Sequence, residues 1–391
     1  MGYLKFQADR LFDGVRFRDS ESVLITDKEG TIVEITTLEN AGDEIQRFEG
    51  FLMPGMINAH CHLELSHLKN CIPPHTGLPT FLKQVVALRS FDPGEVALAI
   101  ETAAVEMQQN GIVAVGDICN KIDTASFKAS SKIRWHNFIE VISFTNAKAE
   151  ENLARYQEIA KVFEEHSNIT ETIQRTTLVP HAPYTVSPEA FKKLNELTKC
   201  QLISIHNQEC AAENEMYEKG SGAFYEFFQQ MNIPVSDFPI THKSSLQSYL
   251  PYFNQSQTLL LIHNTTIAST DLSFAIQHAQ SNKMNIHYCL CVNANLYIEN
   301  KLPPIPMLLD AGVSIVLGTD SYSSNWQLSI IKEVQTIHQN FPSIPLETIL
   351  QWATLQGAQA FGWEKELGSF EKGKRPGVLV VGEDWGVRRY V

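Results

Sequence analysis

The sequence predicts an α/β protein: a (β/α)8 barrel of the TIM-like kind, beside a small composite β-sandwich formed by the N- and C-terminal segments. Two observations predict the barrel. Short apolar runs alternate with helical stretches through the middle of the chain, and the candidate strands are as many as such a barrel needs. A third observation predicts the sandwich, because both ends of the chain have strand-like patterns. We expect the sandwich over residues 1–54 and 363–391, and the barrel over residues 55–362.

Length and composition are those of an ordinary globular protein. The 391 residues can bury a large core, and a content of 43% hydrophobic and 19% charged residues is typical of soluble domains. The formal net charge of −13 argues against nucleic acid or an anionic membrane as a partner. No segment approaches the ~18 apolar residues of a membrane-spanning helix, and the first residues lack the apolar region of a signal peptide.

Cysteine usage predicts a reducing compartment. The seven cysteines are odd in number, and no two of them form a Cys-x-x-Cys pair. Several lie in apolar, strand-like runs, as Cys119, Cys289 and Cys291 do. We therefore expect packed, reduced thiols in a cytoplasmic protein. The expected partners are a small-molecule substrate and, as an open alternative to a monomer, further copies of the same chain.

Short strands are predicted at both ends of the chain. Turn residues near the start separate the candidate strands Leu4–Ala8, Ser22–Thr26, Thr31–Ile35 and Phe48–Leu52. Near the end, the apolar run Val378–Val381 follows a Lys-Gly-Lys turn. Because both ends are strand-like while the middle alternates, we expect the two termini to pair with each other.

The middle of the chain supplies the alternating strands and helices of the barrel. The candidate strands, as many as such a barrel needs, end near His62, Asp117, Ile142, His181, His206, His263, Tyr288 and Asp320. Helices are predicted over residues 93–110, 150–166, 187–199, 269–282, 326–340 and 346–361. Short helices are predicted at 78–89 and 222–232, within long connections that follow the first and fifth strands. Long loops of this kind usually cover the active site of a barrel.

Two histidines close the first barrel strand, in the run Pro54-Gly55-Met56-Ile57-Asn58-Ala59-His60-Cys61-His62. Side chains alternate between the two faces of a strand, so His60 and His62 project from the same face. Two neighbouring imidazoles suit a divalent metal ion. A pair of ordinary, hydrogen-bonded histidines is the alternative, and the rest of the chain has to decide between the two.

Ionisable residues close further candidate strands. The clearest are His206 after Leu-Ile-Ser-Ile, His263 after Leu-Leu-Leu-Ile, and Asp320 at the end of Ser-Ile-Val-Leu-Gly-Thr-Asp. Buried ionisable groups cost several kcal/mol unless they are paired or metal-bound, so packing alone does not explain so many of them. The carboxyl ends of barrel strands meet at one face. We therefore predict a site for one divalent ion, zinc or else iron(II), held by His60, His62, His206 and Asp320.

Three residues have the positions that catalysis would need. Glu209 lies just beyond the fifth strand, where a carboxylate can carry a proton to a leaving nitrogen; the alternative is a solvent-facing residue in an acidic loop. Asp320 can bind the metal and orient a water whose pKa the metal lowers toward ~7. His263 can hydrogen-bond the reacting centre.

These motifs resemble the amidohydrolase superfamily, in particular its mononuclear-metal deaminase and chlorohydrolase branch, which includes guanine deaminase and aminofutalosine-deaminase-like enzymes. The matching segments span nearly the whole chain in order: Pro54–His62, His181–Pro188, His206–Glu209, Leu261–Asn264 and Leu308–Asn325. The resemblance implies the same four metal ligands and catalytic roles for Glu209, His263 and Asp320. It also implies that His181 contacts the substrate. The run His62-Leu63-Glu64 gives Glu64 a substrate contact or, equally, the role of a loop carboxylate.

The resemblance implies hydrolytic deamination of an amino-substituted nitrogen heterocycle that is purine- or nucleoside-like, in the finer match aminofutalosine-like, by metal-bound hydroxide. The fourth strand ends in Val179-Pro180-His181 without the lysine of two-metal members, which favours one metal. The segment Cys289–Asn295 departs from the branch's Cys-Pro-x-Ser-Asn run and leaves the substrate open. Two alternatives remain: a cyclic amide or aryl chloride hydrolase using the same site, and a non-catalytic binding protein of the same fold.

Overall fold

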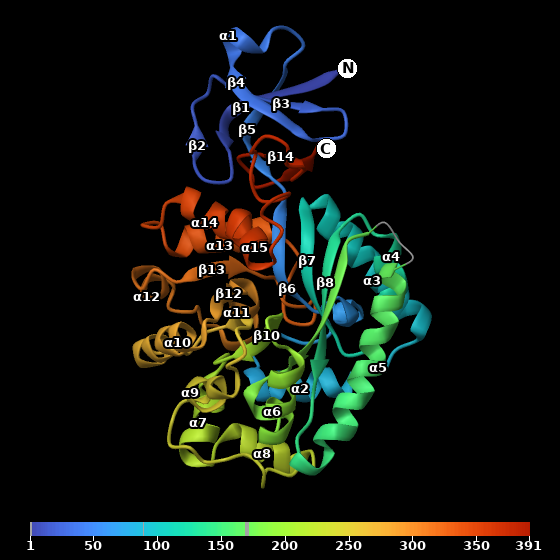
Figure 1. Ribbon diagram of the computed structural model, residues 1–391, viewed down its shortest axis with the longest axis vertical. Coiled ribbons are helices and arrows are strands. Elements are labelled where there is room, and N and C mark those ends of the chain that lie inside the picture. Colours follow the sequence, from blue (N-terminus) through green and yellow to red (C-terminus); the bar gives the residue numbers. More distant parts are fainter. Residues whose placement is uncertain (1, 89, 169–171) are drawn as a thin grey trace.

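Parallel strands form a barrel in the middle of the chain, in two four-stranded halves. The computed structural model describes residues 2–88, 90–168 and 172–391, and Figure 1 shows the barrel below a smaller sheet built from both chain ends. The first half consists of β6 (Met56–Cys61), β7 (Ile112–Cys119), β8 (Arg134–Val141) and β9 (Gln174–Pro180). The second half consists of β10 (Leu202–Asn207), β11 (Thr258–His263), β12 (Asn285–Leu290) and β13 (Ser314–Leu317). The predicted barrel is confirmed.

The two halves meet at two seams, and predicted site residues supply the backbone contacts at both. At one seam the His206 N–H donates to the carbonyl of His181 at 3.0 Å. At the other, the N–H groups of Thr319 and Asp320 both donate to the carbonyl of His60 at 3.0 Å. Closing the barrel therefore brings residues from distant parts of the chain to one edge.

Helices surround the barrel, and their apolar faces pack against the strands. They are α3 (Pro93–Gln109), α4 (Ala125–Ser130), α5 (Ala149–Asn168), α6 (Pro188–Leu197), α10 (Ser269–Asn282), α11 (Val292–Glu299), α12 (Ile305–Asp310), α13 (Ile330–Asn340), α14 (Leu346–Ala353) and α15 (Leu355–Ala360). The helix predicted over 346–361 is two helices, because the backbone leaves the helical region at Thr354 (φ −129°, ψ −89°). The helix predicted from residue 326 begins only at Ile330, after a turn.

Short helices lie in the long connections that follow β6 and β10. The first connection contains a 3₁₀ turn, Leu63–Leu68, and α2 (Leu78–Ala87); Arg89, at the end of the predicted helix, lies outside the described residues. The second contains α7 (Ala211–Lys219), α8 (Ala223–Gln230) and α9 (Ser245–Tyr249). Further 3₁₀ turns lie at Asn146–Lys148, Pro183–Thr185 and Leu250–Tyr252. Among the described residues, none of the helices is both long and apolar enough to cross a membrane.

The two ends of the chain form one mixed seven-stranded sheet, as Figure 1 shows at the top. Its members are β1 (Tyr3–Phe12), β2 (Phe17–Arg18), β3 (Ser22–Asp27), β4 (Ile32–Thr37), β5 (Gln46–Pro54), β14 (Val378–Val381) and β15 (Val387–Arg389), with α1 (Leu38–Ala41) beside them. The strand order is β15-β14-β5-β1-β3-β4, with β2 paired to β1. The predicted pairing of the two termini is confirmed, since β14 runs antiparallel to β5.

Gly55 joins this sheet to the first barrel strand. A Cβ atom at this position would lie 2.4 Å from the carbonyl oxygen of Pro376 and 2.3 Å from Val113. Only glycine lets the chain pass so close to both neighbours. The passage aligns β6, and thereby places the two histidines that follow.

Candidate metal centre and active site

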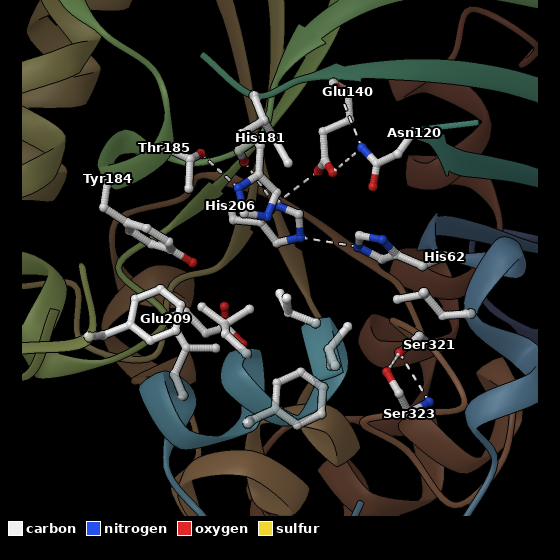
Figure 2. A pocket seen from close by; sticks show the side chains of 18 of the residues that line it. His62, Asn120, Glu140, His181, Tyr184, Thr185, His206, Glu209, Ser321 and Ser323 are labelled. Carbon is white, nitrogen blue, oxygen red and sulfur yellow. Dashed lines mark hydrogen bonds and ion pairs between the residues drawn. The ribbon is translucent and has the colours of Figure 1, made fainter. Parts of the chain in front are cut away.

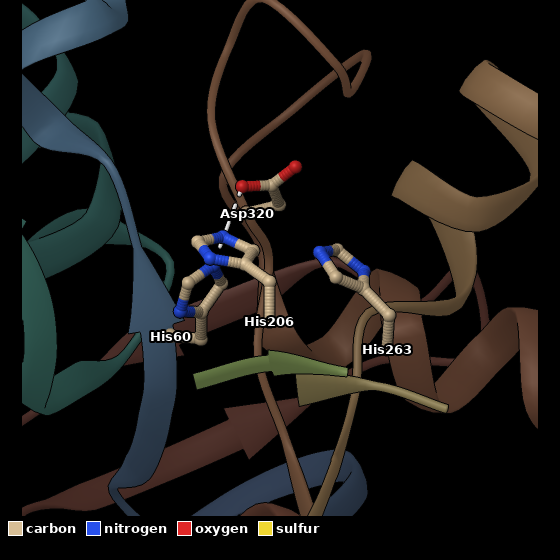
Figure 3. Close-up of side chains that lie close together, drawn as sticks. All are labelled: His60, His206, His263 and Asp320. Atoms are coloured by element: carbon tan, nitrogen blue, oxygen red, sulfur yellow. Dashed lines mark ion pairs between the residues drawn. The ribbon is translucent and has the colours of Figure 1, made fainter. Parts of the chain in front are cut away.

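The predicted ligands come together at the carboxyl edge of the barrel. His60 lies near the end of β6 with His62 just beyond it, His206 and His263 lie at the ends of β10 and β11, and Asp320 follows β13. In Figure 3 the side chains of His60, His206, His263 and Asp320 point toward a common space. One donor atom from each of these four lies within 4.8 Å of the donor atoms of the other three.

His62 belongs to the same cluster. Its Nε2 lies 3.2 Å from Nε2 of His206 and 3.4 Å from Oδ1 of Asp320, which is also 3.4 Å from Nε2 of His60. A second group of three donors, within the same 4.8 Å limit, combines His62 and His206 with Glu140. The four ligands and the histidine predicted beside them are therefore neighbours: His60, His62, His206, Asp320 and His263.

Burial keeps the histidines of the cluster neutral. Loss of solvent holds the pKa values of His60, His62 and His263 well below the ordinary value and lowers that of His206. For Asp320 burial favours the acid, but the neighbouring histidines and the Ser324 hydroxyl outweigh it and lower the pKa. The cluster thus combines neutral imidazoles with an ionised carboxylate, which is a donor set for a divalent cation.

Lone pairs in this cluster also lack protein partners. His60 is fully buried, and neither of its ring nitrogens has a hydrogen-bond partner among the described residues. The Nε2 atoms of His62 and His206 face each other directly, 3.2 Å apart. Buried polar atoms normally have partners. The donors present therefore fit a bound cation.

Hydrogen bonds outside the cluster orient two of the rings. The Nδ1 atom of His206 lies 2.8 Å from the carbonyl of His181, which directs Nε2 toward the cluster. The amide of Asn295 lies 3.2 Å from Nδ1 of His263. When Asn295 donates to that nitrogen, Nε2 of His263 carries the proton. This Nε2 lies 3.6 Å from Oε1 of Glu209.

Glu209 is a buried carboxyl group beside the histidines. It lies just after β10 and is 4% exposed. Burial raises its pKa well above the ordinary value, and the charges of Asp320 and Glu213 raise it further. A carboxyl group in such surroundings can hold a proton near neutral pH and transfer it. The alternative of a solvent-facing glutamate does not describe this position.

A cavity of about 290 Å³ opens beside the cluster. Figure 2 shows His62 and His206 facing each other in it, with Glu140, Asn120 and His181 nearby. One wall of the cavity is apolar and comes from the two long connections. Its members are Leu78, Phe81, Leu82, Val85 and Val86 from α2, and Phe227, Phe228, Met231 and Ile233 from α8 and the turn after it. The expectation that these connections cover the site agrees with this arrangement.

The two predicted substrate contacts differ in position. His181 lines the cavity, and its Nδ1 lies 2.7 Å from the hydroxyl of Thr185. Glu64 is not among the residues that line the described cavity, and its Oε2 accepts the N–H groups of Asn120 at 2.9 Å and Lys121 at 3.2 Å. These two contacts hold the turn after β7, and a contact between Glu64 and the substrate stays a prediction.

Sequence reasoning missed Glu140 and Asn120. Both line the cavity, the Asn120 amide donates to Oε2 of Glu140 at 2.9 Å, and Oε1 of Glu140 lies 3.4 Å from Nδ1 of His206. One signal could have found Glu140, since it is the only carboxylate in the apolar run Trp135–Phe144. Asn120 follows its strand without a comparable signal.

Four residues around the site have left-handed backbone conformations that are rare outside glycine. They are Gln208 (φ 46°), His263 (φ 74°), Asn264 (φ 59°) and Asp320 (φ 58°). Strained backbone of this kind persists only where surrounding contacts hold it, and it concentrates at functional sites. The Asn264 side chain supplies one such contact, donating to the carbonyl of Leu261 at 2.7 Å.

Known proteins match both the sequence and the fold. The amidohydrolase family model matches residues 51–385. An adenosine deaminase of Helicobacter pylori is 27% identical over 355 residues, which are 88% of this chain and 82% of that protein. A 5-methylthioadenosine/S-adenosylhomocysteine deaminase of Bacillus cytotoxicus is 23% identical over 350 residues, 85% of this chain and 73% of its own length.

Solved structures share the whole fold. The aminofutalosine deaminase of Helicobacter pylori in complex with methylthio-coformycin superposes with a TM-score of 0.79 at 24% identity, covering 97% of this chain and 92% of that one. An adenosine deaminase from Xanthomonas campestris with bound zinc gives a TM-score of 0.69 at 22% identity, with 97% and 84% covered. The family match over most of the chain, together with these relatives, identifies the protein as a member of the amidohydrolase family and as a deaminase-type hydrolase of carbon–nitrogen bonds.

Proposed function

We propose that this protein deaminates a purine nucleoside by hydrolysis, using one divalent cation held by His60, His62, His206 and Asp320. The observation that carries the proposal is the buried Glu209 carboxyl beside a His/Asp cluster, in a cavity that apolar side chains also line. The cation is proposed to be zinc, which suits imidazole and carboxylate donors, with iron(II) as the alternative. A relative from Xanthomonas campestris binds zinc.

The cation, when bound, lowers the pKa of water and makes a nucleophile available at neutral pH. The rest of the chemistry belongs to side chains. Replacing the exocyclic amine by oxygen breaks a C–N bond, forms a C–O bond and moves both protons of water. Glu209 is proposed to accept these protons, giving one to the adjacent ring nitrogen and one to the departing amine, which leaves as ammonia. Its raised pKa suits both halves of that transfer.

His263 and Asp320 complete the proposed proton path. With Asn295 donating to its Nδ1, His263 presents an N–H at Nε2, and this N–H can hydrogen-bond the oxygen that attacks the ring. Asp320, held by the Ser324 hydroxyl at 2.5 Å, keeps a carboxylate oxygen facing the histidines and can orient the water. His181 is proposed to contact the purine from the cavity wall.

The apolar wall supports a finer proposal about the substrate. This wall comes from α2, α8 and the turn after α8. A nucleoside that presents its amine to Glu209 is proposed to place its sugar substituent against it. Apolar surface favours an apolar substituent there. We propose a purine nucleoside with an apolar group on the sugar, of the aminofutalosine or methylthioadenosine kind on which the named relatives act.

Ammonia release by zinc-loaded protein tests the proposed reaction. The compounds are adenosine, 5′-methylthioadenosine, aminofutalosine, guanine and a chlorinated triazine. We expect ammonia from the adenine nucleosides and its loss in Glu209→Gln. Glu215→Gln is the matched control, because Glu215 lies on the neighbouring helix α7 and its side chain is 39% exposed. Zinc-loaded protein that releases no ammonia from any of these compounds, or a Glu209→Gln variant with normal turnover, contradicts the proposal.

A further inference from the structure

The turn that carries Glu209 has an unfavourable backbone conformation. Its preceding residue, Gln208, is fully buried and has a φ of 46°, in the left-handed region that side chains other than glycine rarely adopt. Such a conformation persists only when contacts around it hold it in place. The position of the Glu209 carboxyl therefore depends on whatever holds this turn.

Glu213, one helical turn further along, lies directly against the turn. Its Oε1 accepts the backbone N–H of Gln208 at 2.8 Å, and its Oε2 faces the N–H of Glu209 at 3.4 Å. A single carboxylate thus reaches the two consecutive N–H groups that define the turn. Its own position is held by the hydroxyl of Ser245, which donates to Oε1 at 2.5 Å.

The side chain of Gln208 is held independently of Glu213. Its side-chain amide donates to Asp271 at 2.8 Å and to Asn214 at 3.2 Å. The backbone carbonyl of Gln208 also accepts the N–H of Thr266 at 2.9 Å. These contacts tie the turn to α10 and to the loop after β11. None of these contacts involves the N–H of Glu209. Among the described contacts, only Glu213 reaches that N–H.

A carboxylate at this place needs an explanation, because Glu213 is fully buried and makes no ion pair with a lysine or arginine among the described residues. Its pKa is raised to about 7, because the effect of burial outweighs the hydrogen bonds from Ser245, Gln208 and Glu209, which act to lower it. If Glu213 only anchored helix α7, a neutral side chain could do so at a lower cost in desolvation free energy. Here each of the two oxygens of Glu213 faces a different backbone N–H group, and an amide side chain in its place would offer only one acceptor oxygen.

We propose that Glu213 is a positioning residue for Glu209, holding the strained 207–209 turn so that the Glu209 carboxyl faces the reacting atoms. The inference rests on the proposed role of Glu209. It assigns Glu213 no contact with substrate or metal. Misplacing a catalytic group by as little as ~1 Å can cost about a hundredfold in rate, so the effect of losing Glu213 should appear in turnover.

Glu213→Gln is the informative variant, because it keeps the size of the side chain and replaces one acceptor oxygen by an NH2 group that cannot accept the Glu209 N–H. We expect kcat to fall about ten- to a hundredfold, with KM, zinc stoichiometry and unfolding temperature close to those of the unmodified protein. Hydrogen exchange of the peptide spanning residues 206–212 should become faster, while the remaining peptides stay unchanged. Ser245→Ala, which leaves both N–H contacts in place, should reduce kcat less.

The experiment also measures Glu213→Gln in the Glu209→Gln background. If Glu213 acts through Glu209, it has no further effect on the residual rate there. A Glu213→Gln variant with normal kcat, or one whose loss is equal in both backgrounds or appears as lost zinc, overturns the positioning role. A Glu209→Gln variant with normal turnover overturns the proposed function instead, and the positioning role with it. If Glu213→Gln is too unstable to purify, Glu213→Asp in the same two backgrounds gives the same comparison.

Discussion

At the scale of single residues, burial decides the charge state of most histidines that matter in this protein. The imidazoles of the cluster have lowered pKa values because they are desolvated, which is the state in which their nitrogens can donate to a cation. His136 shows the same effect away from the cluster. It is 3% exposed, it lies 2.6 Å from the hydroxyl of Thr177, and burial followed by the charge of Arg175 lowers its pKa to about 3.

His136 should make the protein less stable in mild acid. The unfolded chain protonates this histidine near pH 6.5, whereas the folded chain does not until about pH 3. Between these values the unfolded state binds the extra proton, so stability rises with pH and is lost as pH falls below about 6.5. Both proteins should lose free energy of unfolding, measured in urea, when the pH is lowered from about 7 to about 5. We expect the loss in His136→Gln to be about 2 kcal/mol smaller than in the unmodified protein. Equal losses in both proteins would contradict this.

At the scale of elements, a buried ion pair holds the connection that leaves the first barrel strand. The Lys128 ammonium, from α4, lies 2.5 Å from Oδ2 of Asp117 on β7, and both side chains are fully buried. The other oxygen of Asp117 accepts the N–H of Leu63 at 2.8 Å, directly after His62. The pair therefore links α4 and β7 to the segment that carries two of the proposed ligands.

Lys128→Met should be strongly destabilising. Removing the cation leaves the Asp117 carboxylate buried and uncompensated, at a cost of about 3–5 kcal/mol. Adding Asp117→Asn should recover much of that loss, because the second substitution removes the unpaired charge. Urea unfolding of the single and double variants measures both effects. A double variant that is less stable than Lys128→Met would show that the carboxylate is needed for another reason.

The helices of the two long connections are expected to decide which substituent the substrate carries. Phe227 on α8 lines the cavity and is only partly buried, so Phe227→Ala should fold normally. Losing that apolar contact should lower kcat/KM for 5′-methylthioadenosine by about tenfold, corresponding to about 1–2 kcal/mol of apolar burial, and leave adenosine unaffected. Steady-state kinetics on both nucleosides checks this. Equal losses of kcat/KM on the two nucleosides would show that Phe227 contacts the purine or ribose that they share, and not the 5′ substituent.

At the scale of the whole molecule, the cluster joins the two halves of the barrel. Its members come from both four-stranded halves, and the backbone bonds at both seams run through His60, His181 and His206. A cation held by these side chains would therefore cross-link the halves, and a ligand that binds only the folded state stabilises it by mass action. Metal binding and barrel stability are expected to be coupled.

Removing the metal should consequently lower stability as well as activity. With free zinc about a thousandfold above its Kd, the bound cation adds about 4 kcal/mol to the free energy of unfolding. We expect chelation to abolish ammonia release and to lower the melting temperature, and zinc to restore both. His60→Ala is the control, since its melting temperature should respond little to zinc. A chelated protein that melts like the loaded one would contradict the proposed site.

Several parts of the fold could be predicted because they depend on local patterns. Alternation of apolar runs with helical stretches predicted the barrel, and the ionisable residues that close those runs predicted His60, His62, His206 and Asp320 as neighbours, since the ends of parallel strands meet at one edge. The break at Thr354 could not be predicted in this way. Its surroundings have the periodicity of one helix, and packing decides where the backbone turns.

The sequence alone determined the order of elements, the pairing of the two chain ends and the residue types at the strand ends, because these follow from periodicity and turn chemistry. Only the tertiary structure decided how the side chains are used. It placed Glu64 on the backbone after β7, brought Glu140 into the cavity, and set Glu213 under the strained turn. The physical reason is that these contacts join segments that the chain's local pattern does not relate, and they exist only once the barrel has closed.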